Sequence, residues 1–256
     1  MNWNIHTHTT RCRHADGSDE DYILTAIDAG YTALGFSDHA PMPFSEGYYS
    51  TMRMYPEQLP EYICSLTALR ERYGDRIELK IGLEVEYYPG LFSDFLRLIA
   101  PYPVEYLLLG QHFLYDEIGS PWMGRPTDDP NHLRAFVQQS CDGMKTGLFT
   151  YLAHPDLIWF TGDESLYHDQ MALLCQTAKE TNTPLELNIN GALKDRNYPD
   201  PRFWQIAADS GCTCIIGCDA HSPDALLSIE AEQRCRAIAE SCGILLAERV
   251  PLVPPF

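Results

Sequence analysis

The stretch WNIHTHTTRCRHADGSDEDYILTAIDAGYTALGFSDH, residues 3–39, shows the pattern of elements that continues along the chain. Residues 3–9 and 31–39 are short apolar runs that predict strands, and residues 18–30 between them predict an amphipathic helix. Ser18 precedes an acidic first turn and Gly30 closes the helical pattern, as expected for the two caps of a helix. The stretch therefore predicts a strand–helix–strand unit.

The same alternation extends over nearly the whole sequence, without a linker or a clear internal repeat. About seven strand–helix units in 256 residues predict one α/β domain spanning residues 1–256, built as a closed or nearly closed parallel barrel. A doubly wound open sheet stays an alternative, because periodicity alone does not exclude it. Further strands are predicted at 77–88, 104–113, 148–157, 184–190 and 212–221, and further helices at 56–74, 90–100, 129–147, 163–182, 200–211 and 223–241.

The charge balance is strongly acidic, with 18 Lys and Arg against 36 Asp and Glu and a net charge of −18. Such a surface repels nucleic acid, and any site for a small phosphorylated substrate must carry its own local positive charge. The nine cysteines include no CxxC pair and predict reduced, mostly buried thiols of a cytoplasmic protein. We expect no membrane association, because no apolar stretch is long enough to span a bilayer and the N-terminal sequence has no secretory-signal pattern.

Residues that can bind metal occur at one place in each predicted unit, the C-terminal end of the strand. Active sites of parallel α/β barrels are built at that edge. Because residues i and i+2 of a strand point to the same face, His6 and His8 can bind one ion together. Asp219 and His221 form a second pair of this kind. The full series is His6, His8, His39, Glu84, His112, His154, Asp219 and His221, with His14 in the first loop.

A single histidine at a strand end is more often a capping or core residue than a metal ligand, and His132 and His168, in predicted helices, are interpreted in that way. The complete series at one edge instead predicts two or three ions that share a bridging carboxylate. Imidazole and carboxylate ligands suit zinc, iron or manganese, and the sequence does not choose among them.

Seven motifs in this order resemble the polymerase and histidinol phosphatase (PHP) superfamily. They are HTHT, SDHAPMP, GLEVEYY, GQHF, AHPDL, LELNING and GCDAHSP. SDHAPMP, and LELNING followed by Tyr198-Pro199, are similar to the histidinol-phosphatase branch. The resemblance implies a distorted, TIM-like (β/α)7 barrel with a trinuclear metal centre. It assigns His6, His8, Glu84 and Asp219 to the first ion, Glu84, His112 and His154 to the second, and His14, His39 and His221 to the third.

The resemblance also implies a metal-dependent phosphomonoesterase. The branch predicts hydrolysis of L-histidinol phosphate to L-histidinol and phosphate, a step of histidine biosynthesis, by a hydroxide that bridges the metal ions. The group that protonates the leaving oxygen stays open among a metal-bound water, Asp38 and His221. Asp38 is alternatively expected to orient a neighbouring imidazole.

Substrate contacts are predicted from charge. Lys194 and Arg196, which follow LELNING, are expected to bind the phosphate. The acidic residues Glu46, Glu86, Asp116 and Glu186 are available for a cationic amine. After AHPDL, related phosphatases often carry a basic residue, whereas this chain has Ile158, Trp159 and Phe160, which favours an altered or broader substrate.

Three alternatives to histidinol-phosphate hydrolysis stay open. A PHP phosphatase or phosphodiesterase could act on other small phosphates such as nucleotides. A metal-binding module without catalysis is disfavoured by the complete ligand set, and an amidohydrolase by the lack of a strand-end lysine suited to a carbamylated bridge. The sequence does not predict an oligomeric state.

Overall fold

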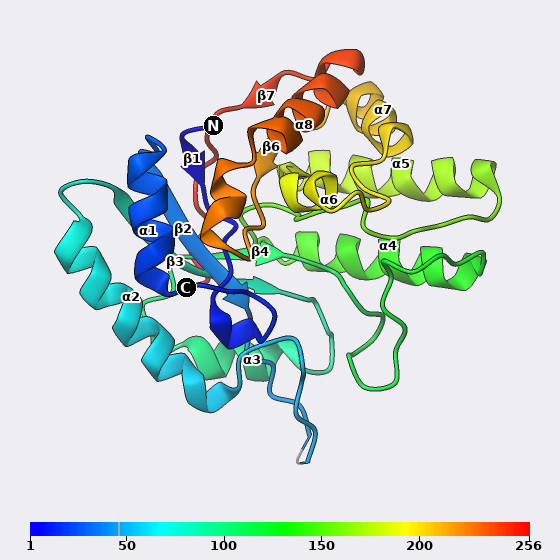
Figure 1. The fold of residues 1–256 in the computed structure, drawn as a ribbon. Coiled ribbons are helices and arrows are strands. Elements are labelled where there is room, and N and C mark those ends of the chain that lie inside the picture. The colour runs from blue at the N-terminus through cyan, green and yellow to red at the C-terminus, as the bar shows by residue number, and fades with distance from the viewer. Residues whose placement is uncertain (46) are drawn as a thin grey trace.

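The computed structural model describes residues 1–45 and 47–256, and within them seven parallel strands form two sheets (Figure 1). The first sheet has four neighbouring strands in chain order: β1 (Trp3–Asn4), β2 (Ala33–His39), β3 (Glu78–Val85) and β4 (Tyr106–Leu109). The second has three: β5 (Leu185–Asn188), β6 (Cys214–Gly217) and β7 (Leu246–Ala247).

Isolated parallel bridges close the two sheets into a ring. Leu152 bridges both Leu109 of β4 and Leu185 of β5, and Thr7 bridges Ala220, just after β6. The closure confirms the distorted α/β barrel and makes the alternative of an open doubly wound sheet wrong.

The strand predicted at 148–157 is reduced to the bridge at Leu152. His154, two residues later, has a φ of 30°. Pro155 follows it and has no N–H to donate to a sheet ladder. The backbone therefore leaves the sheet direction where the predicted strand would have continued.

Helices surround the ring, as Figure 1 shows. Ser18 caps the first one through a reciprocal pair of hydrogen bonds with Asp21, as its position in the sequence predicts. The predicted helix at 223–241 is divided at Ser228 into a 3-10 turn and a helix. The helices are α1 (Asp19–Asp28), α2 (Leu59–Tyr73), α3 (Phe92–Ile99), α4 (Pro130–Lys145), α5 (Glu164–Glu180), α6 (Ile189–Leu193), α7 (Pro201–Ser210) and α8 (Ile229–Ser241), and the 3-10 turns are η1 (Thr10–Cys12), η2 (Pro56–Gln58) and η3 (Pro223–Leu227).

The inside of the barrel is filled by a small apolar cluster that includes Trp3, Ile5 and Tyr106. The Tyr106 hydroxyl donates to the carbonyl oxygen of Ile5 at 2.7 Å. Gly82 on β3 lies against the Tyr106 ring, and a Cβ at that position would collide with it. Within the described residues, no helix combines the length and the apolar character that a membrane crossing requires.

Candidate metal centre

Glu84, near the C-terminal end of β3, lies at the centre of the predicted ligand series. Its Oε1 is 2.8 Å from His154 Nε2, and its Oε2 is 2.9 Å from His39 Nδ1. The Nε2 atoms of three further imidazoles each lie 3.6 Å from a Glu84 oxygen; they belong to His6, His8 and His112. A Cβ at Gly110, just after β4, would collide with Glu84 Oε1, so this close approach requires glycine. One carboxylate therefore faces five imidazoles.

Asp219 supplies a second carboxylate to the same cluster. Its Oδ1 is 3.0 Å from His8 Nε2 and 3.6 Å from His6 Nε2, so the predicted pair His6 and His8 does converge. Its Oδ2 accepts from Asn190 Nδ2 at 3.0 Å. Asp219 has a φ of 50° and His154 one of 30°. Left-handed backbone at non-glycine residues costs about 1–3 kcal/mol and is concentrated at functional sites.

The outer part of the centre contains His14, His39 and His221. His14 Nδ1 lies 2.8 Å from the carbonyl oxygen of Cys12, and His221 Nδ1 lies 3.0 Å from that of Asp219. When both Nδ1 atoms donate, the two Nε2 atoms, which are 2.9 Å apart, face each other with lone pairs. A cation bound by both nitrogens would satisfy the two lone pairs. The ligand atoms of His14, His39 and His221 all lie within 4.8 Å of one another.

The cluster contains buried nitrogen and oxygen atoms that have no hydrogen-bond partner and can bind metal ions. Within residues 1–45 and 47–256, the buried side-chain atoms without a hydrogen-bond partner include ring nitrogens of His6, His8, His39 and His154 and Oε2 of Glu84. Buried polar atoms normally have a partner, so a group of orphans in one place indicates that a ligand supplies it. Imidazole nitrogens and carboxylate oxygens are ligands of zinc, iron and manganese.

The electrostatics of the cluster also favour cations. Burial lowers the pKa of His6, but the carboxylates of Glu186, Asp219 and Glu84 raise it to about 10. Burial raises the pKa of Glu84, yet the surrounding imidazoles hold it well below its usual range. Glu84 is therefore ionised and attracts positive charge, which a proton or a metal ion can provide.

The position of Glu186 on β5 shows that the prediction of a substrate contact for this residue is wrong. It is fully buried, and its Oε1 accepts from His6 Nδ1 at 2.7 Å and from Tyr151 Oη at 3.1 Å. A Cβ at Gly217 would collide with the same oxygen. The carboxylate therefore lies beneath the cluster and orients the His6 ring.

Asp38, one of the two predicted proton donors, is fully buried beneath His8. Its Oδ2 accepts from the Thr9 hydroxyl, and its Oδ1 accepts from the backbone N–H of His39 at 2.9 Å. Oδ1 also lies 3.4 Å from His8 Nδ1. A carboxylate in this position cannot reach a leaving group above the centre, and the alternative expectation that Asp38 orients an imidazole stays a prediction.

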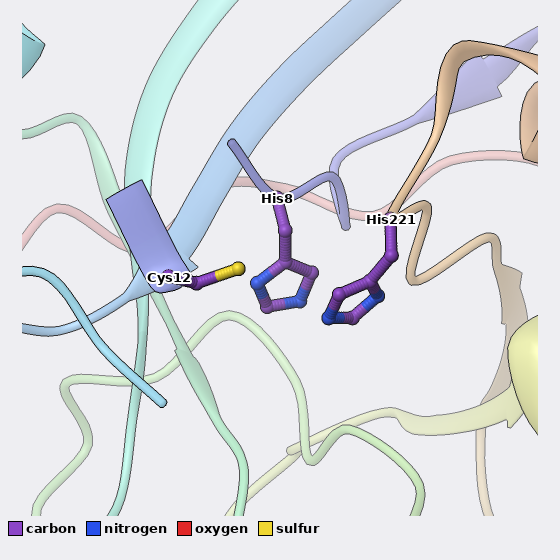
Figure 2. Close-up of side chains that lie close together, drawn as sticks. All are labelled: His8, Cys12 and His221. Carbon is purple, nitrogen blue, oxygen red and sulfur yellow. The ribbon is translucent and has the colours of Figure 1, made fainter. Parts of the chain in front are cut away.

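Cys12, which the sequence analysis does not single out, lies beside the centre. Figure 2 shows its sulfur directed toward the His8 ring, with His221 on the other side of that ring. Ligand atoms of these three residues lie within 4.8 Å of one another. The signal that could have revealed Cys12 is its position between His8 and His14, in the 3-10 turn η1.

A cavity of about 290 Å³ covers the centre. Lys194 and Arg196 line it, and their contact with a phosphate stays a prediction. Asp116 is not among the described lining residues, and neither is Trp159. Glu46 lies outside the described residues. The lining consists of His14, His39, Thr51, Met52, His112, Phe113, Trp122, Asn190, Lys194, Arg196, Tyr198, Asp219 and His221.

Comparison with known proteins agrees with this arrangement. A protein of Deinococcus radiodurans described as a probable histidinol-phosphatase is 29% identical over 234 residues, which cover 85% of each chain. A Schizosaccharomyces pombe protein with the same description is 32% identical over 245 residues, which cover 85% of this chain and 80% of the relative.

A crystal structure of histidinol phosphate phosphatase from Lactococcus lactis, in complex with zinc, L-histidinol and phosphate, matches with a TM-score of 0.70 at 19% identity. The match covers 96% of this chain and 95% of that chain, and at this identity it shows a shared fold. The family model described as PHP domain matches residues 4–190. Together with the 32% identical relative, this match shows that the chain belongs to the PHP domain family.

Proposed function

We propose that this protein is a metal-dependent phosphomonoesterase that hydrolyses L-histidinol phosphate to L-histidinol and phosphate. The observation that carries the proposal is the convergence of imidazoles and carboxylates beneath a cavity lined by two cationic side chains, Lys194 and Arg196. The names of the two relatives support the choice of substrate. A net charge of −18 supports a small substrate rather than nucleic acid.

The ligand series suits two to three divalent ions of zinc, iron or manganese. When bound, such ions neutralise phosphate oxygens and lower the pKa of a water that attacks phosphorus. The first ion is assigned to His6, His8, Glu84 and Asp219, the second to Glu84, His112 and His154, and the third to His14, His39 and His221.

Lys194 and Arg196 bind the phosphate group in this proposal. Arg196 Nη1 donates to the Tyr198 hydroxyl at 3.1 Å, and its guanidinium lies 5.7 Å from the Trp122 ring centroid. These contacts hold the cation at the edge of the cavity, where it compensates the acidic surface. Of the two residues predicted to protonate the leaving oxygen, only His221 lines the cavity, but its Nε2 is assigned to the third ion and its Nδ1 faces the carbonyl oxygen of Asp219. His221 therefore has no free proton to donate, and the proposal leaves this role to a water at the centre.

The rest of the cavity wall suits the histidinol part. Met52, Phe113 and Trp122 provide apolar and aromatic surface for an imidazole ring. The alternative of a broader phosphatase depended on residues 158–160. Ile158 and Phe160 are buried in the core, and Trp159 is 42% exposed outside the cavity lining. The lack of a basic residue at positions 158–160 therefore does not change the described cavity wall, and histidinol phosphate is the favoured substrate.

A turnover screen tests the substrate. The metal-loaded protein is assayed with histidinol phosphate, nucleoside monophosphates and sugar phosphates at equal concentrations. We expect kcat/KM to be highest for histidinol phosphate, by about tenfold or more, which corresponds to about 1.4 kcal/mol of transition-state discrimination. A nucleotide or sugar phosphate with an equal or higher kcat/KM would refute the choice of substrate.

The phosphate contacts are tested by Lys194→Met and Arg196→Met. Each change removes a charge-assisted hydrogen bond worth about 1.5–3 kcal/mol, so we expect kcat/KM to fall by about 10- to 100-fold. Lys145→Met is the matched control, because Lys145 is an exposed residue of α4 outside the cavity lining. Steady-state kinetics with histidinol phosphate measures the effect. Wild-type kinetics in both cavity variants would remove these residues from the phosphate site.

A further inference from the structure

Arg53 is a fully enclosed cation that no motif in the sequence marks. Its side chain is 1% exposed, and it divides its donors between two carboxylates from different segments. Nη1 and Nη2 each donate to one oxygen of Glu86 at 2.8 Å, and Nε donates to Glu117 Oε2 at 2.7 Å. A paired guanidinium with this planar fork fixes the position of both oxygens of Glu86.

Glu86 connects Arg53 to the metal centre. It follows β3 directly, and its Oε1 also accepts from His112 Nδ1 at 3.0 Å. The opposite ring nitrogen, His112 Nε2, faces Glu84. Because one oxygen of Glu86 is shared by Arg53 and His112, the guanidinium sets where that acceptor lies and so sets the orientation of the imidazole. This contact also corrects the prediction that Glu86 faces a substrate amine.

Glu117 connects Arg53 to the wall of the cavity. Its Oε1 accepts from the hydroxyls of Tyr48 at 2.8 Å and Ser50 at 2.6 Å. Arg53 and these two residues belong to segment 47–55, and Thr51 and Met52 of the same segment line the cavity. The ion pair with Glu117 therefore holds the segment from which the cavity wall is built.

The buried network of Arg53, Glu86 and Glu117 has an excess of negative charge. One guanidinium faces two carboxylates, and all three groups are buried, which leaves one negative charge without a partner inside the network. Buried charge of this kind is costly unless it is compensated. His112 adjoins the network, so a cation held by His112 meets this excess charge.

We propose that Arg53 is a positioning residue of the hydrolytic centre: through Glu86 it orients His112 for metal binding. This inference rests on the proposed function in one respect, namely that His112 binds metal. Lysine cannot replace Arg53, because a single ammonium cannot hold both oxygens of Glu86 and an oxygen of Glu117 in one plane.

The test compares Arg53→Lys and Glu86→Gln with Glu117→Gln, which is the matched control. Glu117→Gln weakens the other contact of Arg53 but leaves the contact between Glu86 and His112. Zinc affinity is measured by chelator competition without substrate, and the melting temperature of each metal-free variant reports its stability. We expect the zinc ion assigned to Glu84, His112 and His154 to lose about 10- to 100-fold in affinity in Arg53→Lys and Glu86→Gln, and less than about threefold in Glu117→Gln.

Kinetics separates positioning from general stability. We expect Glu86→Gln to lower kcat with little change in KM, and Glu117→Gln to raise KM because the cavity wall loosens. Arg53→Lys disturbs both contacts, so it should lower kcat and raise KM. Unchanged zinc affinity in Arg53→Lys and Glu86→Gln, or an equal loss in Glu117→Gln, would overturn the proposal. If Arg53→Lys does not fold, the comparison of Glu86→Gln with Glu117→Gln decides alone. Weaker zinc binding in Glu86→Gln, in a protein that never hydrolyses histidinol phosphate, would refute the proposed function and leave the role of Arg53 standing.

Discussion

Two deep imidazoles of the centre, His6 and His112, differ from two outer ones, His14 and His221, in what the second ring nitrogen contacts. In the deep part, Nδ1 of His6 lies 2.7 Å from a carboxylate oxygen of Glu186, and Nδ1 of His112 lies 3.0 Å from one of Glu86. In the outer part, Nδ1 of His14 and of His221 faces a backbone carbonyl oxygen. A carboxylate partner makes the imidazole a more basic ligand than a neutral carbonyl does.

Burial follows the same division. His6 and Glu186 are fully enclosed, whereas His14 is exposed at the edge of the cavity. One cluster therefore contains two environments. We expect the deep ions to be bound more tightly, because carboxylates fix the deep imidazoles and make them more basic ligands. The outer ion lies where substrate enters and exchanges more readily.

Glu84→Gln should have the largest effect, because Glu84 belongs to the deep part and faces five imidazoles. The amide replaces one of the two carboxylate oxygens by an NH2 group that does not bind metal, so the two proposed ions no longer share a bridging carboxylate. We expect kcat to fall by more than about 100-fold, beyond the range found for groups that only support a ligand. Steady-state kinetics and metal analysis of the purified variant measure the loss. Activity near wild type, in a variant with a native circular dichroism spectrum, would show that Glu84 does not bridge metal ions.

Glu186→Gln should have the second-largest effect, and it tests the carboxylate support directly. The amide keeps the shape of the side chain but not the charge that makes His6 basic. We expect the affinity for a deep zinc ion to fall by about 10- to 100-fold, measured by chelator competition. Glu180→Gln, at the exposed end of α5, controls for the loss of a negative charge. An unchanged affinity in Glu186→Gln would mean that the deep and outer imidazoles do not differ in the way proposed.

The barrel and the metal-binding residues of the centre could be predicted from the sequence, because both depend on local sequence patterns. Apolar runs that alternate with amphipathic segments predict the barrel, and the barrel brings all strand ends to one mouth. Glu84, Asp219 and seven of the histidines meet there as expected. The short strand β7 and the loss of the strand at 148–157 were not predicted, since both depend on backbone geometry that periodicity does not encode.

The residues that support the metal-binding histidines could not be predicted from the sequence in the same way. Glu84 and Glu86 share a face in the sequence pattern, but only Glu84 faces the other imidazoles, while Glu86 turns to Arg53 and His112. Arg53 lies 33 residues from Glu86 and in no recognisable motif. Glu186 lies 180 residues from His6. Whether a strand-end carboxylate faces the cavity or lies beneath a ligand depends on such distant partners, which a single sequence does not reveal.

Cys12→Ser should have the smallest effect, and it tests the boundary between the two environments. The backbone carbonyl of Cys12 faces the outer His14, while its sulfur is directed toward the deep His8 (Figure 2). Substitution leaves the carbonyl in place and exchanges only the thiol, a weak hydrogen-bonding group without charge. We therefore expect zinc affinity and kcat to change by less than about threefold, far below the range for a carboxylate support. A loss as large as that of Glu186→Gln would show that a neutral neighbour of an imidazole matters as much as a charged one, and the comparison of the deep and outer parts would fail.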